Sequence, residues 1–145
     1  MAFPTPQPGL VIGYDFLFRE QADAGQDNAS KPHPAAIILV VRQGDQVRVS
    51  MLAISHAPPR PGEERFRLKL TPAECREIGL DGRDHWINLR DINAFDWPGY
   101  DLVRSAPGGG FVYGRMSKGT FVRVVEGVKG VAGRRVMGRD YEVTV

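Results

Sequence analysis

The side chains that could do chemistry gather where a strand should stop. Val47–Ser55 has the alternation of a buried strand, and Ser55 and His56 are followed by Ala-Pro-Pro-Arg. Proline has no N–H, so a paired strand cannot run through Pro58-Pro59. We therefore expect a hydroxyl, an imidazole and the guanidinium of Arg60 at the rim of a sheet, on a rigid support.

A second histidine is expected at the same rim. Lys31-Pro32-His33-Pro34 leads into Ala35–Val41, the most apolar run of the chain, which predicts a central strand. Gln43-Gly44-Asp45-Gln46 is a tight connection, so the two strands should form an antiparallel hairpin. That hairpin would bring His33 and His56 to one end, where two imidazoles suit general acid–base catalysis. Taken alone, the His33 segment is more simply a loop that enters a strand, and His56 is more simply a hydrogen-bonded structural residue.

A third cluster combines aromatic side chains with Asn and Asp over residues 93–100, Asn-Ala-Phe-Asp-Trp-Pro-Gly-Tyr. Such a segment suits stacking on an unpaired base and hydrogen bonding to it. Core positions for Phe95 and Trp97 are an equally good interpretation. The chain has neither a P-loop nor a nucleophile elbow, and its three histidines lack the spacing of a metal triad. We therefore expect no metal and no other cofactor.

Composition limits the classes of protein. The chain has 145 residues, of which 42% are hydrophobic, which predicts one domain over 1–145 with a single core. The formal net charge is only +2, so any preference for anions must come from local clusters of basic groups. One cysteine, Cys75, allows no disulfide within the chain and fits a reducing compartment. Without a signal peptide or an apolar run near about 20 residues, we expect a cytoplasmic protein with no membrane association.

The remaining pattern predicts a mainly β, α+β domain. Thr71, Pro72 and Glu74 predict a capped helix that ends at Gly79, and Ser117 caps a second helix through roughly Gly127. A long loop is expected over 19–34, a turn or bend over 91–97, and a basic tail over 129–145 that is loose or forms a last strand. Strands are expected over 9–18, 35–41, 47–55, 66–70, 84–89 and 111–115. Hairpin links between them favour an SH3-like small barrel of antiparallel strands with short helices.

The order of these motifs resembles the PemK/MazF family of toxins from type II toxin–antitoxin systems. The resemblance covers roughly Gly9–Val125, with a core of about 9–128. It is carried by these segments: the strand Gly9–Phe18, the loop Arg19–Gly25, Lys31-Pro32-His33-Pro34-Ala35, Ala53-Ile54-Ser55 with His56-Ala57-Pro58-Pro59, Trp86-Ile87, Asn93–Gly99 and Tyr113-Gly114-Arg115. Where the family has Arg before the proline and Thr at the strand end, this chain has His33 and Ser55.

The resemblance implies the MazF/CcdB-type fold, a homodimer and metal-independent cleavage of single-stranded RNA. In that reaction the 2′-OH attacks its own adjacent phosphate and leaves a 2′,3′-cyclic phosphate. A cognate acidic antitoxin would neutralise the enzyme. Carried onto this chain, the resemblance makes His33 and His56 the proton-transfer groups and Ser55 the group that holds the phosphate. Lys31 and Arg60 would be phosphate cations, and the RNA groove would be shaped by Arg19, Glu20, Asn93 and Trp97.

Two other interpretations stay open. The chain could be a catalytically idle barrel that binds nucleic acid or a partner protein, since His33 replaces a permanent cation with a titratable group. A topoisomerase-poisoning toxin of the same fold is the weaker alternative, because such relatives depend on a hydrophobic C-terminal helix end. Here the helix is followed by a basic, Gly-rich tail.

Overall fold

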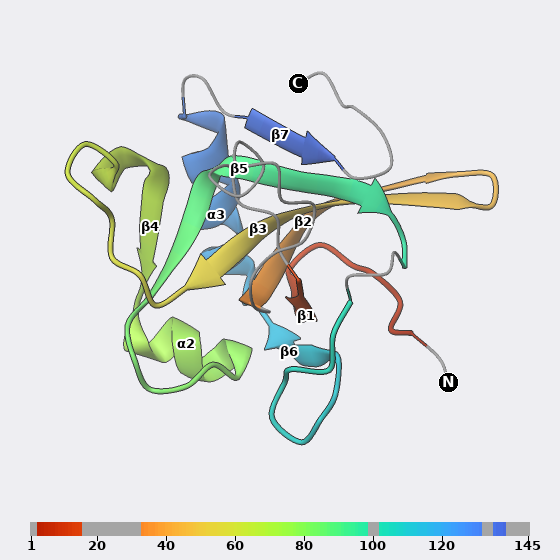
Figure 1. Ribbon diagram of the computed structural model, residues 1–145, viewed down its shortest axis with the longest axis horizontal. Coiled ribbons are helices and arrows are strands. Elements are labelled where there is room, and N and C mark those ends of the chain that lie inside the picture. Colours follow the sequence, from red (N-terminus) through yellow and green to blue (C-terminus); the bar gives the residue numbers. More distant parts are fainter. Residues whose placement is uncertain (1–2, 16–32, 99–101, 132–134, 139–145) are drawn as a thin grey trace.

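The computed structural model describes residues 3–15, 33–98, 102–131 and 135–138. They form a β-rich α+β fold in which one mainly antiparallel sheet carries two short helices (Figure 1). The sheet order is β4-β5-β3-β2-β1-β6, and β7 pairs in parallel with β5. The strands are β1 (Leu10–Tyr14), β2 (His33–Gln43), β3 (Gln46–Ser55), β4 (Arg67–Leu70), β5 (His85–Asp96), β6 (Val112–Arg115) and β7 (Arg135–Gly138). The helices are α2 (Pro72–Ile78) and α3 (Lys118–Lys129), with a 3-10 turn η1 (Glu64–Phe66) before β4.

The predicted hairpin is confirmed. β2 and β3 pair from Gln43 opposite Gln46 to Ala35 opposite Ala53, and Gly44 turns the chain with φ of 60°. The structure extends β2 back to His33, so the expected loop over 19–34 is wrong at its C-terminal end. Pro34 is the second residue of β2, near the strand start where a missing N–H is tolerated.

A second expectation is wrong: β5 is one strand over His85–Asp96, where the sequence predicted a strand over 84–89 followed by a turn or bend over 91–97. Leu52 of β3 lies opposite Ile92, whereas Ile54, two residues on, lies opposite Ile87, five residues back along β5. The surplus residues form a bulge that the Asn88 side chain supports, since its Oδ1 accepts the N–H groups of residues 90 and 91 at 2.9 and 3.0 Å. The polar residues of this bulge resemble a strand end in the sequence, but the ladder resumes beyond them.

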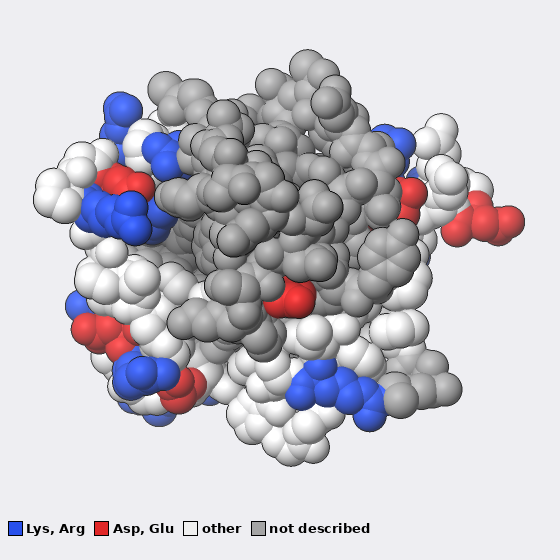
Figure 2. All heavy atoms as spheres, viewed as in Figure 1, with Lys and Arg blue, Asp and Glu red and all other residues white. Residues whose placement is uncertain are grey.

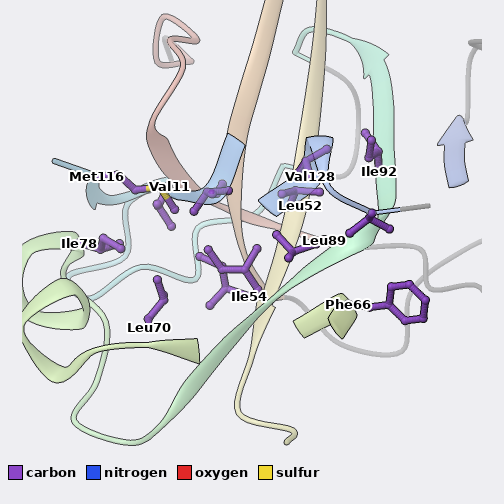
Figure 3. Packing of buried hydrophobic residues seen from close by; sticks show 14 of the residues in the cluster. Val11, Leu52, Ile54, Phe66, Leu70, Ile78, Leu89, Ile92, Met116 and Val128 are labelled. Carbon is purple, nitrogen blue, oxygen red and sulfur yellow. The ribbon is translucent and has the colours of Figure 1, made fainter. Parts of the chain in front are cut away.

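Strand alternation divides the apolar side chains between two faces of the sheet. Leu52 and Ile54 of β3 point into one cluster, which α2 and α3 cover and which Figure 3 shows from close by. Met51 and Ala53, the alternate residues, belong to a second cluster with Tyr14 and Phe95, whose rings stack with centroids 4.9 Å apart. Phe95 is only 1% exposed, so it is a core residue.

Helix α2 begins beside one outer strand of the sheet, β4, and ends against the other, β6. It follows β4 directly, and its C-terminal end packs against β6 at the opposite edge. The contact is so close that a Cβ on Gly114 would overlap the carbonyl oxygen of Ile78. Gly79 ends the helix as predicted, in the left-handed conformation with φ of 89°. The sheet is thereby bent around α2, and α2 is held in a fixed position beside the ends of β3 and β5.

Helix α3 and β7 complete the fold. Ser117 caps α3 as predicted, and its Oγ accepts the N–H of Thr120 at 3.2 Å. Val124 and Val128 of α3 are buried against the first face. Of the two alternatives for the tail, a last strand is present over residues 135–138: β7 pairs in parallel with residues 91–94 of β5.

Candidate functional site

Three separate segments of the chain meet where β3 ends. His56 follows β3 directly, Asp81 lies in the loop between α2 and β5, and His85 is the first residue of β5. Pairing of Ser55 with Trp86 across β3 and β5 brings the two neighbouring histidines together. The ring centroids of His56 and His85 are 4.5 Å apart.

Local sequence signals place Asp81 beside the histidines. Thr71 and Glu74 form the expected capping box, with Thr71 Oγ1 accepting the N–H of Glu74 at 3.1 Å and Glu74 Oε1 accepting the N–H of Thr71 at 2.8 Å. Gly79 stops the helix, and only a short turn separates it from β5. Asp81 fixes that turn, because its Oδ1 accepts the N–H of Arg83 at 2.9 Å.

The carboxylate of Asp81 lies close to Nε2 of both imidazoles. His56 Nε2 is 3.0 Å from Asp81 Oδ2, and His85 Nε2 is 3.6 Å from Asp81 Oδ1. The side chains of His56 and Asp81 are 39% and 51% exposed, whereas that of His85 is 3% exposed. An ionised carboxylate can only accept, so His56 donates Nε2–H to Asp81. In the neutral ring, this leaves the Nδ1 lone pair of His56 free to accept a proton.

The buried histidine is tied to the cysteine of α2. His85 Nδ1 is 3.4 Å from Cys75 Sγ. Burial lowers the pKa of His85, and the nearby His56 lowers it further. Burial raises the pKa of Cys75, with smaller contributions from the negative charges of Glu74 and Asp81. Near neutral pH, the group inside the fold is therefore a neutral imidazole against a protonated thiol.

The pKa of the Asp81 carboxyl group lies below its ordinary value. The hydrogen bond from the N–H of Arg83 is the largest cause that lowers the pKa of Asp81, and the two histidines and the Arg83 guanidinium lower it further. The carboxylate is thus ionised near neutral pH. A cavity of about 190 Å³ lies beside it, lined by Leu70, Pro72, Cys75, Arg76, Leu80, Gly82, Arg83 and Asp84 together with Asp81.

The register agrees with the expected proximity of His33 and Ser55. β2–β3 pairing passes through an irregularity between Ile37 and Leu39 and then reaches Ala35 opposite Ala53. His33 and Ser55 each lie two residues beyond that pair, at the same end of the hairpin. By alternation both belong to the face of the second cluster. His56, in contrast, packs against His85 beside Cys75 of α2, on the side of the first cluster, so the described contacts do not bring His56 and His33 together.

The other candidate residues differ in how far they are exposed to solvent. Arg60 is exposed, with its backbone N–H donated to Glu63 Oε1 at 3.2 Å. Trp97 is partly buried and its Nε1 donates to the carbonyl oxygen of Pro4 at 3.1 Å. Asn93 is 2% exposed within β5, a position that does not offer its amide to a ligand on the surface. Lys31, Arg19 and Glu20 lie outside the described residues.

Sequence reasoning missed Asp81 and His85. The available signal was the spacing of four residues between them, Asp-Gly-Arg-Asp-His, immediately after a glycine-terminated helix. That spacing acquires meaning only when β5 is known to pair with β3, which places His85 beside His56. Periodicity in a single strand carries no information about which strand lies next to it.

Charges of both signs are interspersed on the visible face, where Figure 2 shows Lys and Arg beside Asp and Glu over the described residues. Around η1, for example, Arg67 and Arg90 each lie within 4 Å of Glu63, at 3.7 and 3.8 Å. Basic groups here are therefore partly neutralised, in keeping with the low net charge of +2.

No family model matches the chain, and no curated protein or solved structure matches it either. Among the described residues, no helix has the length and apolar character needed to cross a membrane.

Proposed function

We propose that this protein is an endoribonuclease that cleaves single-stranded RNA without a metal ion. The supporting observation is the imidazole of His56 at the exposed end of β3, beside Ser55 and hydrogen-bonded through Nε2 to Asp81. A carboxylate that fixes one ring nitrogen as a donor leaves the other as a base, which is the arrangement needed to take a proton from a hydroxyl.

The reaction needs only proton transfers and stabilisation of charge. His56 Nδ1 accepts the proton of the RNA 2′-OH as the 2′-oxygen attacks the adjacent phosphorus. The bond from phosphorus to the 5′-oxygen breaks, and the leaving oxygen takes up a proton, a role that the resemblance assigns to His33. Ser55 donates a hydrogen bond to a phosphate oxygen, and Arg60 with Lys31 balances its negative charge. The products are a 2′,3′-cyclic phosphate and a 5′-hydroxyl.

The finer assignments depend on the resemblance to PemK/MazF toxins. We propose an SH3-like barrel of the MazF/CcdB type, a homodimer, and a toxin that a cognate acidic antitoxin neutralises. The bend of the sheet around α2, which joins β4 to β6, is compatible with such a barrel. Growth arrest on induced expression, relieved by a small acidic protein encoded beside it, would test the toxin assignment.

Cleavage itself is tested with long single-stranded RNA in excess EDTA. We expect fragments with cyclic-phosphate ends, and no cleavage where the nucleotide carries a 2′-deoxyribose. His56→Asn and His33→Asn should each lower the rate at least about 100-fold, the lower range for a general acid or base. Lys118→Ala, at an exposed position of α3, is the matched control and should leave the rate unchanged.

Two results would overturn the proposal. RNA that is retarded in a gel but remains intact would favour the idle, nucleic-acid-binding barrel. Cleavage that survives both histidine substitutions would exclude the assigned acid and base.

A further inference from the structure

We propose that His56, Asp81 and His85 form a binding site for a divalent transition-metal ion of the class that prefers imidazole and carboxylate ligands, with Zn²⁺ as the test ion. The proposal goes beyond RNA cleavage and does not depend on it. It follows from the juxtaposition of one donor atom from each of the three side chains, all within 4.8 Å of one another.

The spacing of these atoms fits a small metal ion. Zn²⁺ binds imidazole nitrogen and carboxylate oxygen at about 2.0–2.2 Å, so tetrahedral ligand atoms lie about 3.3–3.6 Å apart. The observed separations from Asp81 are 3.0 Å to His56 Nε2 and 3.6 Å to His85 Nε2. Shifts of a few tenths of an ångström would bring these two pairs to the ideal value, and the donor nitrogens of the two histidines lie within 4.8 Å of each other. Two His and one carboxylate leave at least one position for water.

The surroundings of His85 resemble the support that metal-ligating histidines usually have. Such a histidine generally presents one ring nitrogen to the ion and donates the other N–H to a fixed acceptor. Here Nε2 faces Asp81, and Nδ1 lies 3.4 Å from Cys75 Sγ on the opposite side of the ring. Cys75 is therefore a positioning residue that holds the ring, and its sulfur is not one of the ligands.

Access and charge also allow binding. His56 and Asp81 are 39% and 51% exposed, so an ion can reach them without opening the fold. The guanidinium of Arg83 lies 3.6 Å from Asp81 Oδ2, but this side chain is 71% exposed and can swing into solvent when a cation replaces it. The ion would connect β3, the α2–β5 loop and β5, so binding should stabilise the native state.

The alternative interpretation is that the three groups bind no metal and form a surface ion pair between His56 and Asp81, with the buried His85 beside it. The two interpretations differ in a measurable way. An ion pair predicts no saturable uptake of Zn²⁺, whereas a binding site predicts one ion per chain. A binding site also predicts that substitution of either exposed ligand weakens Zn²⁺ uptake, whereas substitution of the neighbouring acidic residue does not.

The experiment uses the full chain without an affinity tag, freed of metal with EDTA and transferred to metal-free buffer. Zn²⁺ is titrated by calorimetry, and Co²⁺ absorption reports the coordination number. We expect one-to-one binding, a rise in melting temperature with Zn²⁺ and no response to Mg²⁺. His56→Gln and Asp81→Asn should each weaken Zn²⁺ binding at least tenfold. Asp84→Asn, an exposed acidic residue in the same turn, is the matched control and should change affinity less than twofold.

Absence of saturable binding would overturn the proposal. So would Zn²⁺ binding that is equal in the wild type, His56→Gln and Asp81→Asn, since the ion would then occupy other groups. Because the ligands substituted are exposed, circular dichroism should show both variants folded. No step of the measurement uses RNA, so a failure of the ribonuclease proposal leaves this test intact, and the reverse also holds.

Discussion

Glu74 offers the sharpest test of how the helices that support the site are held together. Its side chain is 15% exposed and receives donors from three places. Thr71 donates its backbone N–H at 2.8 Å, Thr120 donates its hydroxyl at 3.0 Å, and the Arg123 guanidinium contacts both carboxylate oxygens. One carboxylate thus caps α2 and joins it to α3. Glu74→Gln keeps the shape of this side chain but removes its charge and one of its acceptors.

The size of the effect follows from these bonds. Hydrogen bonds to a charged group contribute about 1.5–3 kcal/mol, against about 0.5–1.5 kcal/mol for neutral pairs. The bond to Arg123 is discounted because its side chain is 40% exposed and solvent screens the pair. We therefore expect Glu74→Gln to lower the free energy of unfolding by about 2 kcal/mol, or the melting temperature by about 4–8 °C.

The pH dependence supplies an independent check. Burial raises the pKa of Glu74, but the hydrogen bonds from Arg123, Thr71 and Thr120 outweigh it, so the folded-state pKa lies below the ordinary 4.5. A lowered pKa means that the unfolded chain binds the proton more readily. The stability that Glu74 contributes is therefore complete above pH 4.5 and is lost as the pH falls through the folded-state pKa. The difference between wild type and Glu74→Gln should shrink over the same interval.

Urea unfolding at a series of pH values measures both effects. Glu77→Gln is the matched control, because it makes the same chemical change at an exposed position of the same helix. It should alter stability by no more than about 0.5 kcal/mol. Equal losses in the two variants, or a difference between wild type and Glu74→Gln that does not depend on pH, would refute the reasoning.

Three further predictions test the fold and the site. Gly114→Ala should cost more than about 2 kcal/mol by forcing α2 away from β6, whereas Gly119→Ala, where a Cβ meets open space, should not; urea midpoints compare them. Asn88→Ala should cost about 2 kcal/mol, because two N–H groups in the β5 bulge lose their acceptor, and Asn88→Asp should not recover that loss in thermal unfolding, because it sets a second carboxylate against Asp91, to which the Asn88 amide donates. Zn²⁺ should inhibit RNA cleavage and EDTA restore it, because metal on His56 Nε2 leaves the proton on Nδ1; undiminished cleavage by the Zn²⁺-loaded protein would contradict the assigned base.

Local chemistry determined several elements of this protein. Thr71, Pro72 and Glu74 specify the start of α2 and Gly79 its end, because caps and the left-handed glycine act within a few residues. The β2–β3 hairpin likewise follows from two alternating runs and the tight turn between them. Such features could be predicted because every interaction that decides them lies within one short segment.

Tertiary structure decided the rest. β5 continues through its bulge because β3 and β7 offer a ladder on both sides, although its own residues resemble a strand followed by a bend. His56 packs against His85 because β3 pairs with β5. The two residues are 29 positions apart in the sequence, so no local pattern encodes their contact. Sequence alone specified which segments are strands and where one must stop, whereas the choice of neighbouring strands, made by burial of two apolar faces at once, determined which polar side chains meet.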